Sequence, residues 1–317
     1  MKSQMLVFDE VKMAGKHCNI CPLGCGADRA EKRGSCGVGG TDGIGERNPY
    51  ETAFIARAAR HYFEEPSVSG TRGSGAIFFS GCNMSCIFCQ NTDISSKIKG
   101  RPVDASELSG LMLRMQELGA HNVNLVTPAP HVEMLLKAIP LARAAGLSIP
   151  IVYNTNAYEK VETLKRLEGL IDIYLPDLKY TEPIAAKKYS GRADYFEYAS
   201  KAVLEMYRQC GTLRLDGNGI AERGIIIRHL VLPGSVDEAR AVLDFIAEHL
   251  PLDTHISLMS QYTPMEGMKP PLDRKLLKRE YARAVEYAYG LGFTNLLTQE
   301  LSSAERDFTP EFNGFFE

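Results

Sequence analysis

Three cysteines in the first third of the chain have the spacing of a metal-binding loop. Cys82, Cys86 and Cys89 form a C-x3-C-x2-C pattern, with Phe88 directly before the third cysteine and the apolar run 76–79 just upstream. Three thiolates can bind three irons of a [4Fe-4S] cluster and leave the fourth iron open to a small ligand, whereas most electron-transfer clusters use four cysteines. The pattern therefore favours chemistry at the cluster, with a zinc knuckle or a chance group of buried thiols as the alternatives.

A second group of cysteines lies near the N-terminus. Cys18, Cys21, Cys25 and Cys36 have the spacing C-x2-C-x3-C-x10-C, among Gly and Pro residues. Four thiolates on tight turns suit a closed zinc site or a second iron–sulfur cluster, and the spacing does not decide between these metals. Residues 1–50 contain few periodic apolar residues, so we expect metal binding to supply their folding energy. Four unligated cysteines are the alternative.

Between and beyond the cysteines, β-branched runs alternate with helical patterns, which predicts parallel strands joined by helices. The expected strands are 76–80, 122–126, 149–153, 171–175, 225–231 and 255–259. The expected helices are 104–118, 132–145, 158–167, 195–209, 237–249 and 274–289. Asp104 and Glu107 have the spacing of a capping box at the start of the first helix.

Six such units are too few for a closed eight-stranded barrel and fit a partial, open (β/α)6 barrel of the TIM type. We therefore expect an α/β protein with two parts. A small Cys-rich metal-binding segment covers residues 1–50, and the barrel domain covers residues 51–317. Cys210 stands apart from both cysteine groups and is expected to be a buried structural thiol.

The composition argues against several classes of protein. The chain has 317 residues and a net charge of -3, so no general attraction to nucleic acid is indicated. No run of about 18 apolar residues is present, so no membrane span is expected. Asp9 and Glu10 stand where a signal peptide would be apolar. We predict a cytoplasmic protein, in which eight cysteines more often bind metals than form disulfides.

The loop 80–91 resembles the signature of the radical S-adenosylmethionine (SAM) superfamily. A resemblance to one group of that superfamily, the pyruvate formate-lyase activating enzyme-like proteins, is seen in the stretches 65–75 and 119–128 and in the N-terminal C-x2-C-P-x2-C-G. The resemblance implies a [4Fe-4S] cluster that cleaves SAM to a 5′-deoxyadenosyl radical, which abstracts a hydrogen atom. It implies an anaerobic oxidoreductase supplied with electrons by a donor such as flavodoxin or ferredoxin. It also places Phe88 at the cofactor.

Two charged residues follow the expected strand 171–175. Asp177 and Lys179 continue its apolar face, and ligands of parallel barrels bind at the C-terminal ends of the strands. The Asp-Leu-Lys run resembles one at the SAM site of glycyl-radical-enzyme activases. Asn154 begins a loop similar to their Asp-Thr-Asn loop, in which the aspartate also helps to bind a monovalent cation. The resemblance thus implies that Asn154, Asp177 and Lys179 bind the cofactor; a solvated ion pair is the alternative for the last two.

Arg228 lies inside an apolar strand and therefore needs an anionic partner. The segment 225–234 resembles the I-R-x-x-V-x-P-G strand of the same activases. The partner of Arg228 could be the carboxylate of SAM or, as the alternative, an Asp or Glu of the barrel. His229 points to the opposite face and is expected to be neutral and packed, whereas Tyr262, after the last clear strand, is expected to touch SAM or the substrate, or to pack.

The sequence departs from the family pattern at two places. Radical SAM proteins usually carry Gly-Gly-Glu after the second strand to bind the SAM ammonium group, and here the matching residues 126–131 read V-T-P-A-P-H. The activases also have Cys-His-Asn at the end of the cluster motif, where this chain has C-Q-N at 89–91. The sequence leaves open how the ammonium group is held.

Three functions remain. The first is activation of a glycyl radical enzyme by hydrogen abstraction from a backbone glycine, which requires a barrel mouth that admits a peptide loop. The second is a radical SAM reaction on a small molecule or another peptide modification. The third is a metal-binding or electron-relay protein that does not turn SAM over, and the open iron argues against it.

Overall fold

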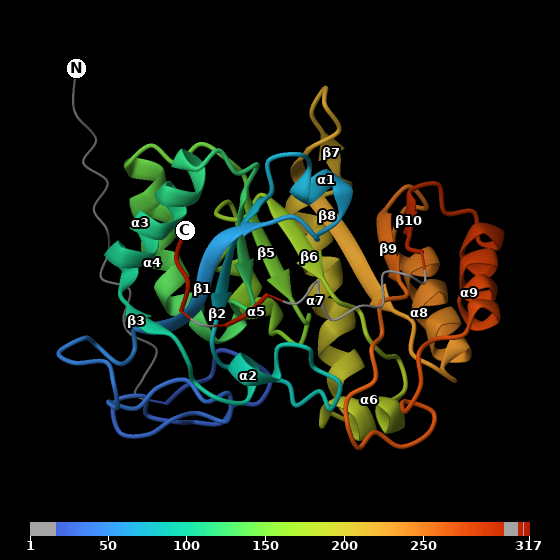
Figure 1. Cartoon of the computed structure of the whole chain (residues 1–317), viewed down its shortest axis with the longest axis horizontal. Coiled ribbons are helices and arrows are strands. Elements are labelled where there is room, and N and C mark those ends of the chain that lie inside the picture. Colours follow the sequence, from blue (N-terminus) through green and yellow to red (C-terminus); the bar gives the residue numbers. More distant parts are fainter. Residues whose placement is uncertain (1–16, 301–309, 313) are drawn as a thin grey trace.

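The computed structural model describes residues 17–300, 310–312 and 314–317. Within these residues the chain folds around one sheet, and the sheet is open because no strand pairing joins β10 to β3 (Figure 1). The order is β10-β9-β8-β6-β5-β4-β2-β1-β3, with β7 paired to β8. The strands are β1 (Ala53–His61), β2 (Ser74–Phe79), β3 (Arg101–Val103), β4 (Val123–Val126), β5 (Ile151–Thr155), β6 (Ile173–Pro176), β7 (Arg214–Leu215), β8 (Ala221–Leu230), β9 (His255–Met259) and β10 (Leu296–Thr298).

The six strands expected from the sequence are all present, as β2, β4, β5, β6, β8 and β9, and all run parallel. They confirm the α/β, partial-barrel class. The short strand β10 adds a further parallel strand beside β9, and β1 lies antiparallel to both β2 and β3. These three added strands extend the two edges of the predicted sheet.

The longer helices cover the outer face of the sheet. The helices are α1 (Pro66–Ser69), α2 (Thr92–Ser95), α3 (Ala105–Glu117), α4 (Val132–Ala144), α5 (Val161–Lys165), α6 (Pro183–Ser190), α7 (Tyr195–Cys210), α8 (Val236–His249) and α9 (Lys278–Gly290), with a 3-10 turn at Ala129–His131. The capping box of α3 is present, since Asp104 and Glu107 each bind the other's backbone N–H. The helix expected over 158–167 is shorter, because Asn156 and Asn83 hold the backbone of Tyr158 in a loop.

A short segment between β1 and β2 fills the interior of the open barrel. Val68 in α1 is fully buried against apolar residues of β5, β6 and β8. Figure 1 shows α1 at one end of the sheet and the cysteine-containing loop with α2 at the other. Because α1 closes the N-terminal end of the strands, a ligand reaches the interior from the opposite, C-terminal end, as in other parallel barrels.

The described part of the Cys-rich segment, residues 17–50, contains turns and loops without a helix or an extended strand. It packs beneath the C-terminal ends of the strands (Figure 1). The Cys82 N–H donates to the Cys36 carbonyl oxygen at 3.1 Å, so the two cysteine groups are joined through one backbone hydrogen bond. The residues used for the signal-peptide prediction, Met1 to Glu10, lie outside the described residues.

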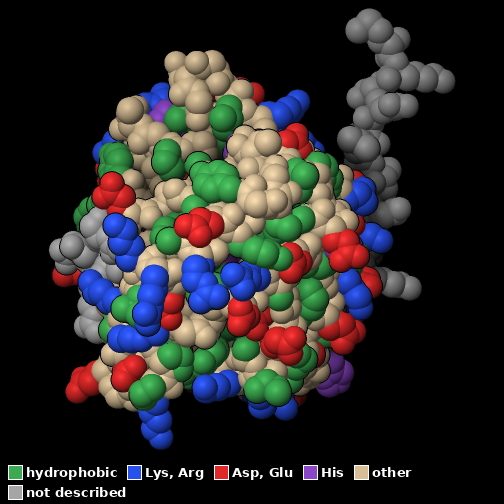
Figure 2. Space-filling view, turned by 90° about the vertical axis from the view of Figure 1, so that its right-hand side faces the viewer, with side chains coloured by type: hydrophobic (Ala, Val, Ile, Leu, Met, Phe, Trp, Pro, Cys, Tyr) green, Lys and Arg blue, Asp and Glu red, His purple; other side chains and the backbone are tan. Residues whose placement is uncertain are grey.

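The surface carries both signs of charge. Figure 2 shows Lys and Arg interspersed with Asp and Glu over the side of the molecule that includes α8 and α9. Such a mixed face, like the net charge of -3, provides no field that would attract a polyanion. In the part of the chain that the structure describes, no helix is long and apolar enough to cross a membrane.

Candidate functional site

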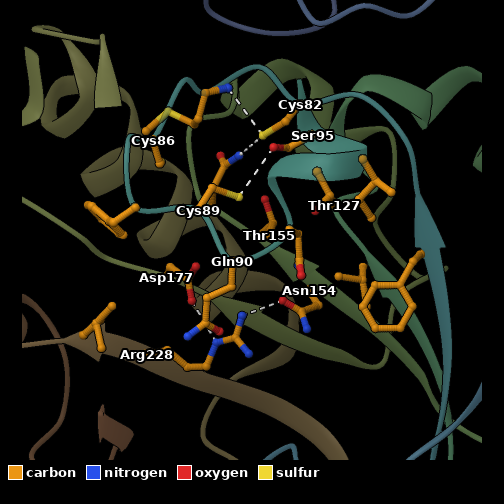
Figure 3. A pocket seen from close by; sticks show the side chains of 18 of the residues that line it. Cys82, Cys86, Cys89, Gln90, Ser95, Thr127, Asn154, Thr155, Asp177 and Arg228 are labelled. Atoms are coloured by element: carbon orange, nitrogen blue, oxygen red, sulfur yellow. Dashed lines mark hydrogen bonds and ion pairs between the residues drawn. The ribbon is translucent and has the colours of Figure 1, made fainter. Parts of the chain in front are cut away.

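The loop after β2 carries the three expected cluster ligands. Cys82, Cys86 and Cys89 line one cavity at the mouth of the barrel (Figure 3). Gly81 starts the loop with φ at 92°, and a Cβ there would lie 2.7 Å from the carbonyl oxygen of Cys36. Because glycine alone tolerates that dihedral together with that contact, it allows the chain to turn sharply from β2 into the cavity.

Each of these thiols has a polar neighbour that can tune a bound cluster. The sulfur-to-partner distances are 3.5 Å for Cys82 and Asn156 Nδ2, 3.0 Å for Cys86 and Ser190 Oγ, and 3.5 Å for Cys89 and Ser95 Oγ. Burial raises the pKa of the Cys82 thiol to about 12. Burial also raises the pKa of the Cys86 thiol, although the Lys179 ammonium acts to lower it. Metal binding would therefore release protons from these thiols.

Three thiols on one cavity, with donors beside the sulfurs, form a donor set that fits an iron–sulfur cluster with an open iron. In the described residues, no group of three or more His, Cys, Asp or Glu side chains is close enough together to hold one metal ion. Binding of a cluster by Cys82, Cys86 and Cys89 therefore stays a prediction.

Arg228 in β8 lies on the opposite wall of the same cavity (Figure 3). Its guanidinium donates to Asp177 Oδ1 at 2.8 Å, to Glu64 Oε2 at 3.1 Å and to Asn154 Oδ1 at 2.5 Å. The prediction that Arg228 needs an anionic partner is confirmed, and the partners are barrel carboxylates. A guanidinium has five N–H donors, and these contacts use three of them.

Asp177 and Lys179 form a second ion pair on this wall, with Lys179 Nζ 2.6 Å from Asp177 Oδ2. Their side chains are only 19% and 17% exposed, so the pair is largely shielded from solvent. Burial would raise the pKa of Asp177, but Arg228 and Lys179 outweigh it and lower that pKa. Burial would lower the pKa of Lys179, and Asp177 reverses this and raises it. Both groups are therefore charged at neutral pH.

Glu64 is a cavity residue that the sequence pattern did not reveal. It enters the barrel from the segment between β1 and α1, and its Oε1 accepts from Asn124 at 2.9 Å and from Asn154 at 3.2 Å. With Arg228, Asp177 and Lys179 it completes a row of alternating negative and positive groups. A loop glutamate before Glu-Pro has no distinguishing local signal, and only the folded barrel brings it to the strand ends.

Aromatic rings form another side of the cavity. Phe88 and Tyr262 both line it and meet edge to face, with ring centroids 6.1 Å apart. The Tyr262 hydroxyl donates to the carbonyl oxygen of Leu272 at 2.6 Å, which fixes the ring against the wall. His229, by contrast, is buried outside the cavity near the Leu178 carbonyl oxygen, and burial lowers its pKa, as expected of a neutral, packed histidine.

A strained residue occupies the place of the missing Gly-Gly-Glu. Thr127 follows β4 with φ at 61°, lines the cavity, and donates its N–H to the Asn154 carbonyl oxygen at 2.9 Å. A β-branched residue in this left-handed region is an outlier that costs on the order of 1–3 kcal/mol. Ala157, after the neighbouring strand β5, has the same φ. The structure therefore keeps a left-handed turn at this position without glycine.

Glu159 supports the loop after β5 from behind. Its carboxyl group accepts from the hydroxyls of Tyr153 and Thr155, and it is only 2% exposed. Burial raises its pKa to about 7, against the two hydrogen bonds, which lower it. Because Thr155 itself lines the cavity, the buried acid positions a cavity residue without touching the cavity.

This buried acid predicts a pH dependence of stability. The folded pKa lies above the unfolded value of 4.5, so Glu159 stabilises the fold below about pH 4.5, and that stability is lost as the pH rises to about 7. When the pH is raised from 5 to 8, we expect the free energy of unfolding of wild type to fall by about 2–3 kcal/mol more than that of Glu159→Gln. Urea unfolding at both pH values measures the difference, and equal losses in the two proteins would contradict the assignment.

The N-terminal cysteines lie together against the cluster loop. A Cβ on Gly34 would lie 3.3 Å from Cys25 Sγ and 3.6 Å from Cys36 Sγ, so both sulfurs flank that glycine. Arg29, which is 4% exposed, donates to Cys18 Sγ at 3.5 Å and to the carbonyl oxygen of Pro130 at 2.8 Å. Burial raises the pKa of Cys21 to about 11. Metal binding by the four cysteines stays a prediction, and the choice of zinc or iron–sulfur stays open.

A metal analysis tests this second site separately from the first. In a variant with Cys82, Cys86 and Cys89 all replaced by alanine, we expect purified protein still to contain zinc or iron, because the N-terminal thiols are a separate set. Cys18→Ser should remove that metal and lower the melting temperature, since the segment has little core of its own. A metal-free triple variant that is still folded would show that the N-terminal site does not exist.

The lone Cys210 at the end of α7 is 9% exposed, with its Sγ 3.5 Å from the carbonyl oxygen of Ile171. It lines no part of the cavity described above. The prediction of a buried thiol outside both cysteine groups is therefore confirmed.

Comparisons with known proteins agree with this geometry. Residues 76–246, more than half of the chain, match the family model described as the Radical SAM superfamily. The uncharacterized protein MJ0674 of Methanocaldococcus jannaschii is 30% identical over 285 residues, which cover 86% of this chain and 74% of that protein. The uncharacterized protein MJ0808 of the same organism is 23% identical, covering 86% of this chain and 80% of that protein.

Two solved structures show more distant likeness. A domain of pyruvate-formate lyase-activating enzyme from Bacteroides vulgatus matches with a TM-score of 0.39 and 12% identity, over 54% of this chain and 92% of that domain. SuiB of Streptococcus suis bound to S-adenosylmethionine matches with a TM-score of 0.47 and 17% identity, over 70% of this chain and 49% of SuiB.

Proposed function

The chain belongs to the radical SAM superfamily, and we propose that it is an enzyme that binds a [4Fe-4S] cluster on Cys82, Cys86 and Cys89, cleaves SAM, and abstracts a hydrogen atom from a polypeptide. The observation that carries the proposal is that these three thiols and a wall of buried charged residues line the same cavity. Together, the cluster and SAM supply one-electron chemistry that ends in hydrogen abstraction. The protein binds, orients and shields them.

The charged wall supports SAM binding. The amino-acid part of SAM carries an ammonium and a carboxylate group, and the wall offers both signs of charge in alternation. Arg228 supplies a cation for a carboxylate, and Glu64 supplies acceptors for an ammonium group in place of the missing glutamate. Lys179 and Asp177 line the same cavity as these groups and the cysteines, and the Lys179 ammonium lowers the pKa of the Cys86 thiol against the effect of burial.

The size of the cavity favours a polypeptide over a second small molecule. Its volume is about 270 Å³, below the range of about 300–1,000 Å³ typical of small-molecule sites. A cavity filled by SAM leaves little enclosed room, so the substrate stays largely outside and inserts one residue. A backbone glycine of a glycyl radical enzyme is the first candidate, with flavodoxin or ferredoxin as electron donor in the cytoplasm.

An isotope-transfer experiment tests this function. The reconstituted, reduced protein is incubated with SAM and a candidate glycyl radical enzyme that contains deuterated glycine. We expect 5′-deoxyadenosine with one added deuterium and a glycyl radical signal by electron paramagnetic resonance (EPR). Cys86→Ala serves as the control and should give neither. Release of unlabelled 5′-deoxyadenosine alone would reject this partner, and deuterium transfer from a small molecule instead would favour the second hypothesis.

A further inference from the structure

The outer edge of β1 is shared between two segments. On its inner side β1 pairs with β2 from Ile55 to His61, whereas on its outer side β3 pairs only with Ala53–Ile55. The next part of the outer edge is occupied by residues 314–317, beside β1 in Figure 1. The Ala58 N–H donates to the Phe315 carbonyl oxygen at 3.1 Å, and the Glu317 N–H donates to the Ala58 carbonyl oxygen at 2.9 Å. These residues therefore form a strand addition parallel to β1.

Arginines recognise the side chains of this added segment. The guanidinium of Arg57 lies 4.9 Å from the ring centre of Phe315, and that of Arg101 lies 4.7 Å from the ring centre of Phe316. Arg60 Nε donates to the Glu317 carboxylate at 2.9 Å. The edge thus binds two consecutive aromatic residues followed by a carboxylate, through cation–π contacts and an ion pair.

The contacts that hold the segment are partly exposed to solvent, although Phe316 is partly buried against the main apolar core. Phe315 is 46% exposed, and the Arg60 and Glu317 side chains are 31% and 26% exposed. Only two backbone hydrogen bonds join the segment to Ala58. An added strand held in this way can be exchanged without disturbing the pairing of β1 with β2, which uses the other side of the strand.

The same segment leads into the cavity. Phe312 packs against Phe78 with ring centroids 5.4 Å apart, and Pro310 lines the cavity together with His61 and Phe63. A chain that pairs with Ala58 in this direction therefore brings the residue six positions before the paired one to the cavity wall, as Phe316 does with Pro310. The edge of β1 and the cavity form one continuous binding surface.

From this continuity we propose that the edge of β1 at Ala58 is a docking site for the polypeptide substrate, and that residues 314–317 occupy it in the free protein. The partner is an extended peptide with two adjacent aromatic residues and a following acidic residue, and it displaces the protein's own segment by strand exchange. The inference rests on the proposed polypeptide substrate. It adds where that substrate binds and which side chains select it.

Peptide binding tests the proposal without SAM turnover. The probe is a fluorescent peptide with the sequence of residues 310–317, measured by anisotropy with the full chain. In wild type the tethered segment competes at an effective concentration on the order of 1 mM, so binding of the added peptide should be weak. In Phe315→Ala/Phe316→Ala we expect binding at least 10-fold tighter. Glu317→Lys, which places a cation opposite Arg60 and leaves both rings in place, should act in the same direction.

Two controls make the result specific. A peptide with both phenylalanines and the final glutamate replaced by alanine should not bind, and adding Arg57→Ala/Arg101→Ala to the double variant should weaken binding of the original peptide. Equal binding by wild type and the variants, no binding by any of them, or equal binding of the alanine peptide would overturn the proposal. Release of 5′-deoxyadenosine, measured without peptide, reports independently whether the SAM chemistry itself is intact.

Discussion

Replacement of Cys82, Cys86 or Cys89 by alanine is expected to abolish release of 5′-deoxyadenosine from SAM. Each variant leaves two thiolates, which are too few to hold a cluster that needs three protein anchors and one open iron. Among the described cysteines only these three line the cavity, so no other one is placed to replace a lost ligand there. The measurement is the rate of 5′-deoxyadenosine formation by anaerobically reconstituted, dithionite-reduced protein, with iron content determined in parallel.

Cys210→Ala is the matched control for this series. It also removes a buried thiol, but one that lies at the end of α7 and lines no part of the cavity. We expect this variant to keep its turnover and to lose only a modest amount of stability. Wild-type turnover in any one of the three cavity variants would contradict the assignment of that cysteine as a cluster ligand.

Arg228→Met is expected to weaken SAM binding and to destabilise the fold. One lost charge-assisted contact of about 1.5–3 kcal/mol corresponds to roughly 10- to 150-fold in affinity. The change also leaves Asp177 and Glu64 without their shared cation, and breaking such a buried pair costs about 3–5 kcal/mol of folding stability. Equilibrium binding of SAM and urea unfolding measure the two effects separately.

Two variants separate binding from folding. Arg223→Met changes an arginine on the same strand whose side chain donates to the Gln209 carbonyl oxygen outside the cavity, and it should leave SAM affinity unchanged. Adding Glu64→Gln to Arg228→Met removes one orphaned carboxylate, so part of the stability should return while SAM binding stays weak. Full recovery of SAM binding in that double variant would show that Arg228 serves only to neutralise its barrel partners.

The strands and the cluster loop could be predicted because their signals are local. Apolar β-branched runs fix β4 or β8 independently of the rest of the chain, and the capping box fixes the start of α3. β10 has three residues and β3 also has three, one of them proline, so their pairing depends on neighbours that come from elsewhere in the sequence. Such short edge strands carry too little periodicity to be recognised alone.

The sequence predicted those cavity residues that lie in the strands or directly after them. Charge after an apolar strand indicated Asp177 and Lys179, and charge inside one indicated Arg228, whereas Asn154 was predicted from the resemblance to the activase loop. Glu64 does not follow from any such pattern, because it lies 164 positions from Arg228 and reaches it only after α1 enters the barrel. The strained φ of Thr127 is likewise invisible in the sequence, since threonine is the wrong residue for a left-handed turn.

The most direct test of the central claim is the EPR spectrum of the reduced cluster with and without SAM. Protein reconstituted with iron and sulfide under anaerobic conditions and reduced by dithionite should show a paramagnetic cluster signal. We expect addition of SAM to change that signal, because SAM would bind the open iron of a cluster held by Cys82, Cys86 and Cys89. Arg228→Met should require a higher SAM concentration for the same change. A reduced cluster whose spectrum is unchanged by saturating SAM would contradict the account.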